Sequence, residues 1–279
     1  MNALFYRFIL IVFVVISCSE NNSKQNNIMS KPINIAFLHH STGGVVDRGN
    51  TSKIYYKLFG KGDVSKYFSK YNKENGIKYN YQSIIFPQKD KYGWNNYPFD
   101  YYNIWVKHAG EAPYNGEPTL EILTQKYDVV IFKHCYPVGD IGFDKDQPNV
   151  DSDERRIENY KEQYLELKKK LHTFPQTKFL VWTGAALVQS KTTPEKAQKV
   201  KEFFEWVKRD WDEPGDNIFI WDFFELETEG GLYLKNEYAS APGNSHPSVA
   251  FGGKVAPFFC KRIVDVVQDK ADNTSLTGW

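Results

Sequence analysis

The sequence predicts a single α/β domain, a three-layer sandwich built on a five-stranded parallel sheet. Apolar runs of strand length recur along the chain, and segments with helical periodicity lie between them. After residue 32, no Pro- or Gly-rich linker divides the chain. Strands that alternate with helices form βαβ units, whose right-handed crossovers place helices on both faces of a parallel sheet. One domain therefore accounts for residues 33–279.

The expected strands are short runs rich in β-branched and aromatic residues. They cover residues 33–39, 80–86, 127–134, 177–183 and 217–222. Five such strands with helices on both faces correspond to a flavodoxin-like sandwich. Open sheets of this kind bind ligands beyond the carboxyl ends of their strands. We therefore expect the functional site in the loops that follow the strands.

The helices are predicted from the spacing of apolar residues. The clearest helix covers about 152–172, where apolar side chains recur at intervals of three and four. A second helix begins after Thr193, a capping hydroxyl followed by Pro194 in the first turn. A last helix runs from about 249 to 269, and the region 51–70 is also predicted to be helical.

The first 32 residues are predicted to lie outside the domain. Arg7 precedes an apolar run at 8–17 that is too short to span a bilayer and ends before Cys18. Residues 15–18 resemble a bacterial lipobox, so 1–18 are predicted to be a lipoprotein signal peptide with lipidated Cys18; an ordinary secretory signal is the alternative. The polar residues 19–32 suit a flexible tether. We expect an exported bacterial lipoprotein, held by its lipid on a membrane in the periplasm or at the cell surface.

Composition limits the classes of ligand. The net charge of +1 gives no basic surface that would predict nucleic acid as a partner. Neither CxxC nor HExxH occurs, so the sequence predicts neither a metal site nor a cofactor. Cys135 and Cys260 form no recognisable disulfide framework. We expect Cys135 to be buried rather than to act as a thiolate with His134, since adjacent strand residues point to opposite faces.

A long aromatic segment follows the second predicted strand. Residues 87–118 include eight aromatic side chains. Loops of this length in a compact domain are commonly functional or are ordered by their own side chains. Two interpretations stay open: the aromatic residues form a satellite core, or they line a substrate cleft. They are Trp94, Tyr97, Phe99, Tyr101, Tyr102 and Trp105, with Tyr92 and Tyr114 at the flanks.

Serine and histidine are predicted to meet at one edge of the sheet. Ser41 follows the first strand in "LHHSTGG", and His246 precedes the last helix in "GNSHPS". Acyl transfer needs this pair, because the imidazole removes the hydroxyl proton during attack and returns it to the leaving group. In the alternative interpretation, Ser41 only caps the next helix and His246 is a hydrogen-bonded loop residue. Of His39 and His40, at most one faces the site, and His40 could shape the pocket.

These motifs resemble those of the SGNH/GDSL hydrolases, and the resemblance covers about residues 33–268. It implies that Ser41 is the nucleophile and His246 the general base. It also implies that Gly93, after the second strand, helps to form the oxyanion hole. No asparagine follows the third strand, so the loop around Cys135 would have to take that role.

The acid that the family places three residues before the histidine is Gly243 here. Asn244 and Asp222 are therefore the candidates for orienting the imidazole. Glu225 and Asp47 are further carboxylates within reach of the same edge.

The resulting prediction is a serine esterase that removes acyl groups, such as acetyl, from carbohydrate. Its substrate would be an acylated small molecule or polysaccharide, with Trp94 in the cleft. Two alternatives stay open: a non-catalytic glycan-binding lipoprotein on the same fold, and an enzyme that transfers the acyl group to a sugar.

Overall fold

The computed structural model describes residues 31–144 and 147–279. The predictions for residues 1–30, including the signal peptide, Cys18 and most of the tether, lie outside the described residues. In the part that is described, none of the helices is both long enough and apolar enough to cross a bilayer.

A parallel five-stranded sheet forms the centre of the domain. Its strands are β1 (Ile33–His39), β2 (Tyr79–Ile85), β3 (Val129–Lys133), β4 (Lys178–Trp182) and β5 (Ile218–Trp221). Their order across the sheet is β2-β1-β3-β4-β5, and all pairs are parallel. The five predicted strands are thus confirmed, with ends that differ by at most two residues.

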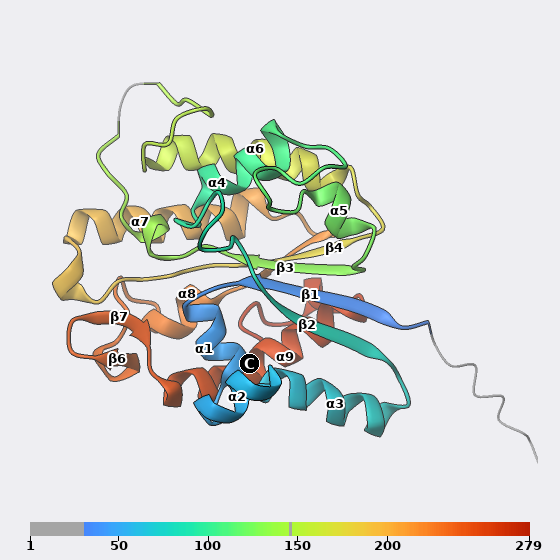
Figure 1. Ribbon diagram of the computed structural model, residues 1–279. Helices are drawn as coiled ribbons and strands as arrows, with labels where there is room; N and C mark the ends of the chain where they lie inside the picture. Colours follow the sequence, from blue (N-terminus) through green and yellow to red (C-terminus); the bar gives the residue numbers. More distant parts are fainter. Residues whose placement is uncertain (1–30, 145–146) are drawn as a thin grey trace, which may run out of the picture.

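Helices cover both faces of the sheet, so the predicted three-layer sandwich is confirmed (Figure 1). One face carries α4 (Pro98–Tyr102), α5 (Leu120–Thr124), α6 (Ile157–His172) and α7 (Pro194–Trp206). The other face carries α1 (Thr42–Arg48), α3 (Asp63–Asn75) and α9 (Val249–Val267). Helices α2 (Lys53–Phe59) and α8 (Phe223–Thr228) complete the set. Short 3-10 or π turns cover Asn103–Lys107, Tyr136–Gly139, Gln189–Lys191, Val207–Trp211, Asn236–Tyr238 and Ala271–Asn273.

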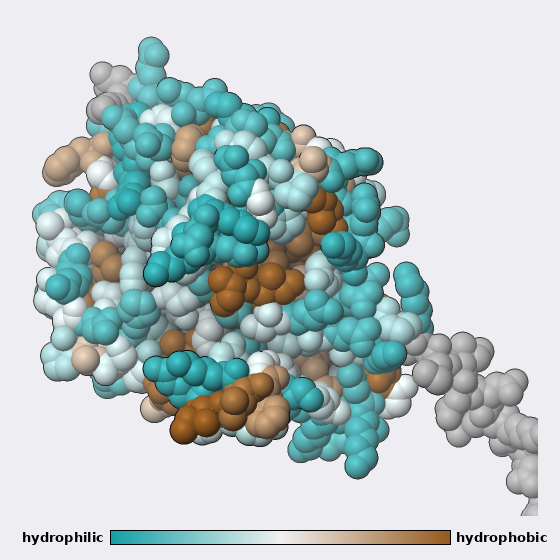
Figure 2. All heavy atoms as spheres, in the orientation of Figure 1, coloured by the Kyte–Doolittle hydropathy of each residue, from teal (hydrophilic) through white to brown (hydrophobic). Residues whose placement is uncertain are grey.

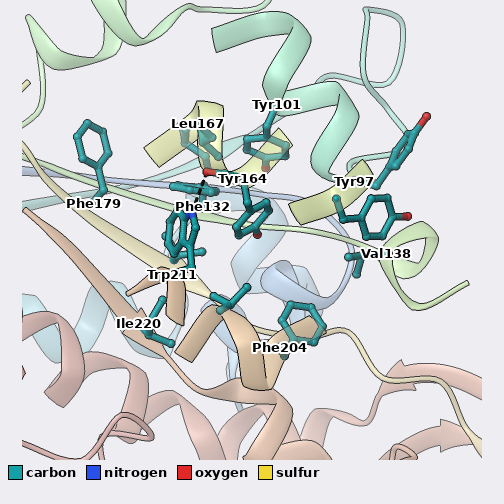
Figure 3. Packing of buried hydrophobic residues seen from close by; sticks show 14 of the residues in the cluster. Tyr97, Tyr101, Phe132, Val138, Tyr164, Leu167, Phe179, Phe204, Trp211 and Ile220 are labelled. Atoms are coloured by element: carbon teal, nitrogen blue, oxygen red, sulfur yellow. Dashed lines mark hydrogen bonds between the residues drawn. The ribbon is translucent and has the colours of Figure 1, made fainter. Parts of the chain in front are cut away.

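Strand residues alternate between two buried clusters, one on each face. Ala36 and Leu38 of β1 pack towards α6, whereas Ile35 and Phe37 pack towards α9. Both clusters contain many aromatic rings, and Figure 3 shows the packing in the cluster that includes Tyr164 and Leu167 of α6. Two of their polar atoms bond to backbone carbonyls: Trp211 Nε1 donates to Tyr164 O at 2.7 Å, and Tyr101 Oη donates to Lys133 O at 2.8 Å. The core is therefore buried without leaving these donors unpaired.

The helical predictions hold with three adjustments. Helix α6 begins at Ile157 rather than 152, because Ser152 forms a local turn in which its Oγ accepts from Glu154 N. The region 51–70 forms two helices, since Gly60 ends α2 in a left-handed conformation with φ of 62°. The last helix ends at Val267. Helix α7 begins as predicted, with Thr193 Oγ1 accepting from Lys196 N.

The aromatic residues after β2 were expected either to form a satellite core or to line a cleft, and the structure places them in two kinds of position. Four of these side chains are buried: Tyr97, Tyr101, Tyr102 and Trp105. The ring of Trp105 stacks on that of Phe86, the residue that follows β2. Trp94, in contrast, is 40% exposed. Tyr97, Tyr101 and Trp105 are part of the main core on the α6 side rather than of the separate satellite core that was expected, and Trp94 is the exception.

A short hairpin between α8 and α9 was not predicted. It pairs β6 (Ala239–Ala241) with β7 (Asn244–Pro247) in antiparallel fashion. Pro242 and Gly243 occupy the two turn positions, and the φ of 69° at Gly243 suits the second of them in a type II turn. Strands of three and four residues are too short to give a periodic signal. This hairpin carries both Asn244 and His246.

Candidate active site

A cavity of about 420 Å³ lies at the carboxyl ends of the strands. Four segments of the chain line it: the ends of β1 and β3, the loop after β2, and strand β7. The lining residues are His40, Ser41, Trp94, Asn95, Cys135, Tyr136, Pro137 and His246. Ser41 and His246, which are about two hundred positions apart in the sequence, thus share one cavity. A cleft of equal volume lined by Tyr238, Phe251 and Trp279 has no histidine in its wall.

Ser41 has a strained backbone and a hydroxyl that does not cap the helix. Its φ of 53° and ψ of −115° are rare for a residue with a side chain, and such conformations cluster at functional sites. Ser41 precedes α1, yet its Oγ makes no capping hydrogen bond. Gly43 allows α1 to start this close to β1, because a Cβ at Gly43 would lie 2.5 Å from His39 Cβ. The geometry therefore removes the capping explanation for the Ser41 hydroxyl.

Asn244 fixes the orientation and the tautomer of His246. The Oδ1 atom of Asn244 accepts a hydrogen bond from His246 N at 3.0 Å, and a backbone N–H can only donate. The same Oδ1 lies 3.0 Å from His246 Nδ1, so the ring must carry its proton on Nδ1 to complete this bond. In the neutral ring Nε2 is then the unprotonated nitrogen, which is the form that a general base needs.

The surroundings of His246 favour the neutral imidazole. Tyr136 meets the ring edge-on, with the ring centroids 4.7 Å apart. Burial lowers the pKa of His246 below its usual 6.5, and the positive charge of Lys133 lowers it further. His246 is therefore unprotonated at neutral pH.

The candidate carboxylates lie elsewhere. The oxygens of Asp222 accept from Thr183 Oγ1 and Lys208 Nζ, and Oδ1 also caps α8 by accepting from Glu225 N. Asp47 accepts from the hydroxyls of Tyr56 and Tyr81. Glu225 lines the cleft beside Tyr238 rather than the cavity that contains Ser41. Of the predicted orienting residues, the structure brings only Asn244 to the imidazole; the suggestion that Asp222 orients it is not supported, because its oxygens serve a helix cap and an ion pair.

His40 and Trp94 form one wall of the cavity. Their rings stack with centroids 4.2 Å apart and planes inclined by 13°. Burial, followed by the charge of Lys133, lowers the pKa of His40 to about 4, so this ring is also neutral. His39 points away, with Nε2 2.7 Å from Ser83 Oγ, as the alternation of strand residues predicts.

Gly93 and Cys135, which were expected to help form the oxyanion hole, do not both face the cavity with a free N–H group. Gly93 is not among the cavity residues; its φ of 85° turns the chain so that Trp94 and Asn95 reach the wall. Cys135 lines the cavity, but its N–H donates to Asn96 O at 2.8 Å and is already used. Both Cys135 and Cys260 are free and buried. His134 points to the other side and bonds Tyr164 Oη at 2.6 Å, so it does not pair with Cys135.

Sequence reasoning missed Lys133, a buried lysine beneath the cavity. Its Nζ donates to Cys135 Sγ at 2.9 Å and to His40 O at 3.4 Å. No carboxylate in the described ranges forms an ion pair with it; burial raises the pKa of the nearby Glu227 carboxyl, and the charge of Lys133 opposes that rise. A buried lysine without an ion pair is costly, which makes a functional role a reasonable inference. Its one signal was a lysine at the end of the otherwise apolar run "VVIFK".

Asn96 is a second residue that the sequence did not single out. It is fully buried at a φ of 57°, and its Nδ2 donates to Phe86 O at 3.2 Å. Through its own carbonyl, which accepts from Cys135 N, it joins the loop after β2 to the loop after β3.

Within the described ranges, no three His, Cys, Asp or Glu side chains are grouped as a metal site would require.

Comparisons with known proteins give weak likenesses. No family model and no curated protein matches the sequence. Among solved structures, a protein of Streptococcus pneumoniae assigned provisionally as a platelet activating factor is 12% identical, with a TM-score of 0.41 over 88% of this chain and 86% of that chain. An active-site mutant of a family two carbohydrate esterase from Clostridium thermocellum is 13% identical, with a TM-score of 0.40 over 85% of this chain and 65% of that chain.

A third structure, of a carbohydrate esterase with divergent catalytic and non-catalytic binding functions, is 14% identical. Its TM-score is 0.36, over 84% of this chain and 69% of that chain. TM-scores below 0.5 support no conclusion, so the function is inferred below from the site itself.

Replacement of Lys133 by methionine should raise the pKa of His246 and of His40. A nearby cation disfavours the imidazolium, so its removal lets the pKa move towards the usual 6.5 while the burial contribution remains. NMR titration of the imidazole nitrogens measures this change. Lys178→Met is the matched control, since Lys178 is the first residue of β4 and lies at the end of the strand away from the cavity. Unchanged imidazole pKa values in folded Lys133→Met would contradict the assignment.

Proposed function

We propose that this protein is a serine esterase of the SGNH type that removes acyl groups from carbohydrate. The observation that carries the proposal is the bond from His246 Nδ1 to Asn244 Oδ1, which leaves Nε2 as a base in the cavity that Ser41 also lines. The β2-β1-β3-β4-β5 order, which flavodoxin-like sheets share, supports the fold that this family implies. We assign Ser41 as the nucleophile, His246 as the general base and acid, and Asn244 as the residue that orients the imidazole.

The proposed reaction has two halves. Nε2 of His246 takes the Ser41 hydroxyl proton while Oγ attacks the ester carbonyl carbon. The tetrahedral intermediate collapses, the C–O bond to the sugar breaks, and the imidazolium returns the proton to the sugar oxygen. Water then attacks the acyl-serine in the same way, releasing the carboxylic acid and restoring Ser41.

The oxyanion is proposed to be stabilised from the Ser41 side. The peptide between His40 and Ser41 carries the Ser41 N–H, which is the proposed donor. Its carbonyl oxygen accepts from Lys133 Nζ at 3.4 Å and from Gly43 N at 3.2 Å. A cation on that carbonyl polarises the peptide and makes its N–H a stronger donor. Gly93 acts in this proposal by orienting Trp94 and Asn95, and Cys135 by holding Lys133.

The substrate class is proposed from the cavity wall. Trp94 is 40% exposed and supported from behind by the His40 ring. A rigid aromatic surface beside the nucleophile can stack on the apolar face of a sugar ring. An acylated saccharide, with acetyl as the simplest acyl group, is therefore the proposed substrate. On the pattern of residues 1–32 alone, we also propose export, lipidation of Cys18 and a membrane attachment through a tether at 19–32.

Two other functions stay possible on the same site. A non-catalytic glycan-binding protein would explain the absence of an acid at Gly243 and of an asparagine after β3. Transfer of the acyl group to a second sugar needs the same residues as hydrolysis, and product analysis with an acceptor sugar present separates the two.

Ser41→Ala should abolish ester hydrolysis while the fold and glycan binding persist. Loss of the nucleophile is expected to lower kcat for p-nitrophenyl acetate by at least about 1,000-fold. Ser69→Ala, on the exposed face of α3, is the control and should retain full activity. Wild-type protein that binds acetylated glycan but hydrolyses no ester would favour the non-catalytic alternative.

Asn244→Asp should move the acidic limb of the kcat/KM profile to higher pH. A carboxylate stabilises the imidazolium, so the pKa of His246 rises and more of the base is protonated in mild acid. Asn244→Ala should instead lower kcat by about 10- to 1,000-fold without the same displacement, because the ring loses its orientation. An acidic limb at the same pH in all three proteins would show that Asn244 does not act on His246.

Trp94→Ala should separate saccharide binding from chemistry. We expect KM for an acetylated oligosaccharide to rise about 10-fold, or about 1.4 kcal/mol of binding, while kcat/KM for p-nitrophenyl acetate changes by less than about 3-fold. Trp94→Phe keeps a ring against His40 and should restore most of the affinity. Equal losses on both substrates would mean that Trp94 supports the site rather than the sugar.

A further inference from the structure

We propose that helix α2 is a contact surface for an anionic phospholipid bilayer. Four large apolar side chains of this seven-residue helix are turned towards solvent. Ile54 is 74% exposed, Leu58 71%, Phe59 59% and Tyr55 41%. No residue of α2 is buried, and Figure 2 shows an apolar patch with hydrophilic side chains beside it where Figure 1 places this helix.

The outward orientation of α2 is fixed by the rest of the fold. Ser52 Oγ caps its start by accepting from Tyr55 N at 3.2 Å, and Gly60 ends it with an N–H bond to Tyr56 O at 2.8 Å. The hydroxyl of Tyr56 donates to the buried carboxylate of Asp47 at 2.6 Å. One tyrosine therefore attaches the helix to α1 and leaves its apolar residues exposed.

The charged residues of the segment 53–62 are all basic, and the next acidic residue, Asp63, accepts from Asn50 N and Thr51 Oγ1. Lys53, Lys57 and Lys61 lie along the apolar surface. Lys53 and Lys57 are one turn apart, as are Ile54 and Leu58, so basic and apolar residues form adjacent stripes. Helices that lie in a membrane interface combine these two features, and lysines near the surface are attracted to anionic headgroups.

The size of the surface favours a membrane over a protein partner. A stable protein interface buries about 800 Å² on each partner, more than four side chains of a short helix provide. Membrane contact has no such minimum, because a weak surface adds to a second attachment such as a single lipid chain. The proposed lipid on Cys18 would supply that attachment. The contact itself is independent of the esterase chemistry.

Docking of α2 would also place the proposed active site close to the bilayer. Helix α1 connects Ser41 to the segment before α2, and its seven residues span only about 10 Å. A substrate at the membrane surface would then lie within reach of the cavity.

Hydrogen exchange of the full chain tests the proposal locally. Mass spectrometry should show at least about 3-fold slower exchange of the α2 amides with phosphatidylglycerol-containing vesicles, and no change with pure phosphatidylcholine vesicles. The double variant Ile54→Ser/Leu58→Ser should lose this protection, as should Lys53→Glu/Lys57→Glu. Ile85→Ser is the matched control, since Ile85 is a 53% exposed apolar residue on β2 and should leave the protection intact.

Unchanged exchange of α2 with anionic vesicles would overturn the proposal, whether or not the chain sediments with them. Protection that depends on protein concentration without vesicles would also overturn it, because the occupant would be a second copy of the chain. The α2 variants should keep wild-type hydrolysis of p-nitrophenyl acetate. Failure of the membrane contact is therefore distinguishable from failure of the proposed esterase.

Discussion

The candidate active site depends on one side chain, the amide of Asn244. Its Oδ1 accepts from His246 N and faces Nδ1 of the same residue, both at 3.0 Å. The backbone bond decides which end of the amide is the oxygen, and the oxygen then decides which ring nitrogen carries the proton. This arrangement follows from the hairpin, whose turn gives Gly243 a positive φ where an aspartate would be strained. The turn that requires glycine at position 243 thus also brings the neutral amide of Asn244 to the ring.

Lys133 gives the site a charge that acts in two directions. Its ammonium disfavours the imidazolium of His246, so the resting base is neutral, but proton transfer from Ser41 becomes harder. The same charge polarises the peptide that carries the proposed oxyanion donor, and there it favours the intermediate. A carboxylate triad stabilises the imidazolium directly, whereas the proposed mechanism relies more on the oxyanion side. In the proposed mechanism, Asn244 therefore orients the imidazole without adding a negative charge, and the buried ammonium of Lys133 supports the oxyanion side.

The sequence predicted the sheet because β1, β3, β4 and β5 are largely apolar runs, mostly buried on both faces as parallel strands are. Strand β2 lies at the edge of the sheet, contains Asn80, Gln82 and Ser83, and is mostly half-buried or exposed. From that sheet, topology alone placed Ser41 and His246 at one edge, and both line one cavity. The orienting residue could not be chosen in the same way, because Asn244 acts through a two-residue separation inside a hairpin too short to predict. Lys133 was missed for a different reason: a lysine at a strand end is usually exposed, and its burial depends on His40 and Cys135, which are contributed by separate loops.

The aromatic residues after β2 explain how the cavity keeps its shape around a strained serine. Tyr101 and Trp105 pack into the core under α6, and Asn96 joins their segment to the loop after β3 through its bond with Cys135 N. Cys135 in turn holds Lys133, whose Nζ reaches the carbonyl preceding Ser41. An unfavourable φ and ψ at one residue costs about 1–3 kcal/mol and persists only where neighbouring contacts determine the conformation. Here those contacts run continuously from the buried aromatic rings to the Ser41 peptide, so the packing of the core and the geometry of the proposed nucleophile are parts of the same structure.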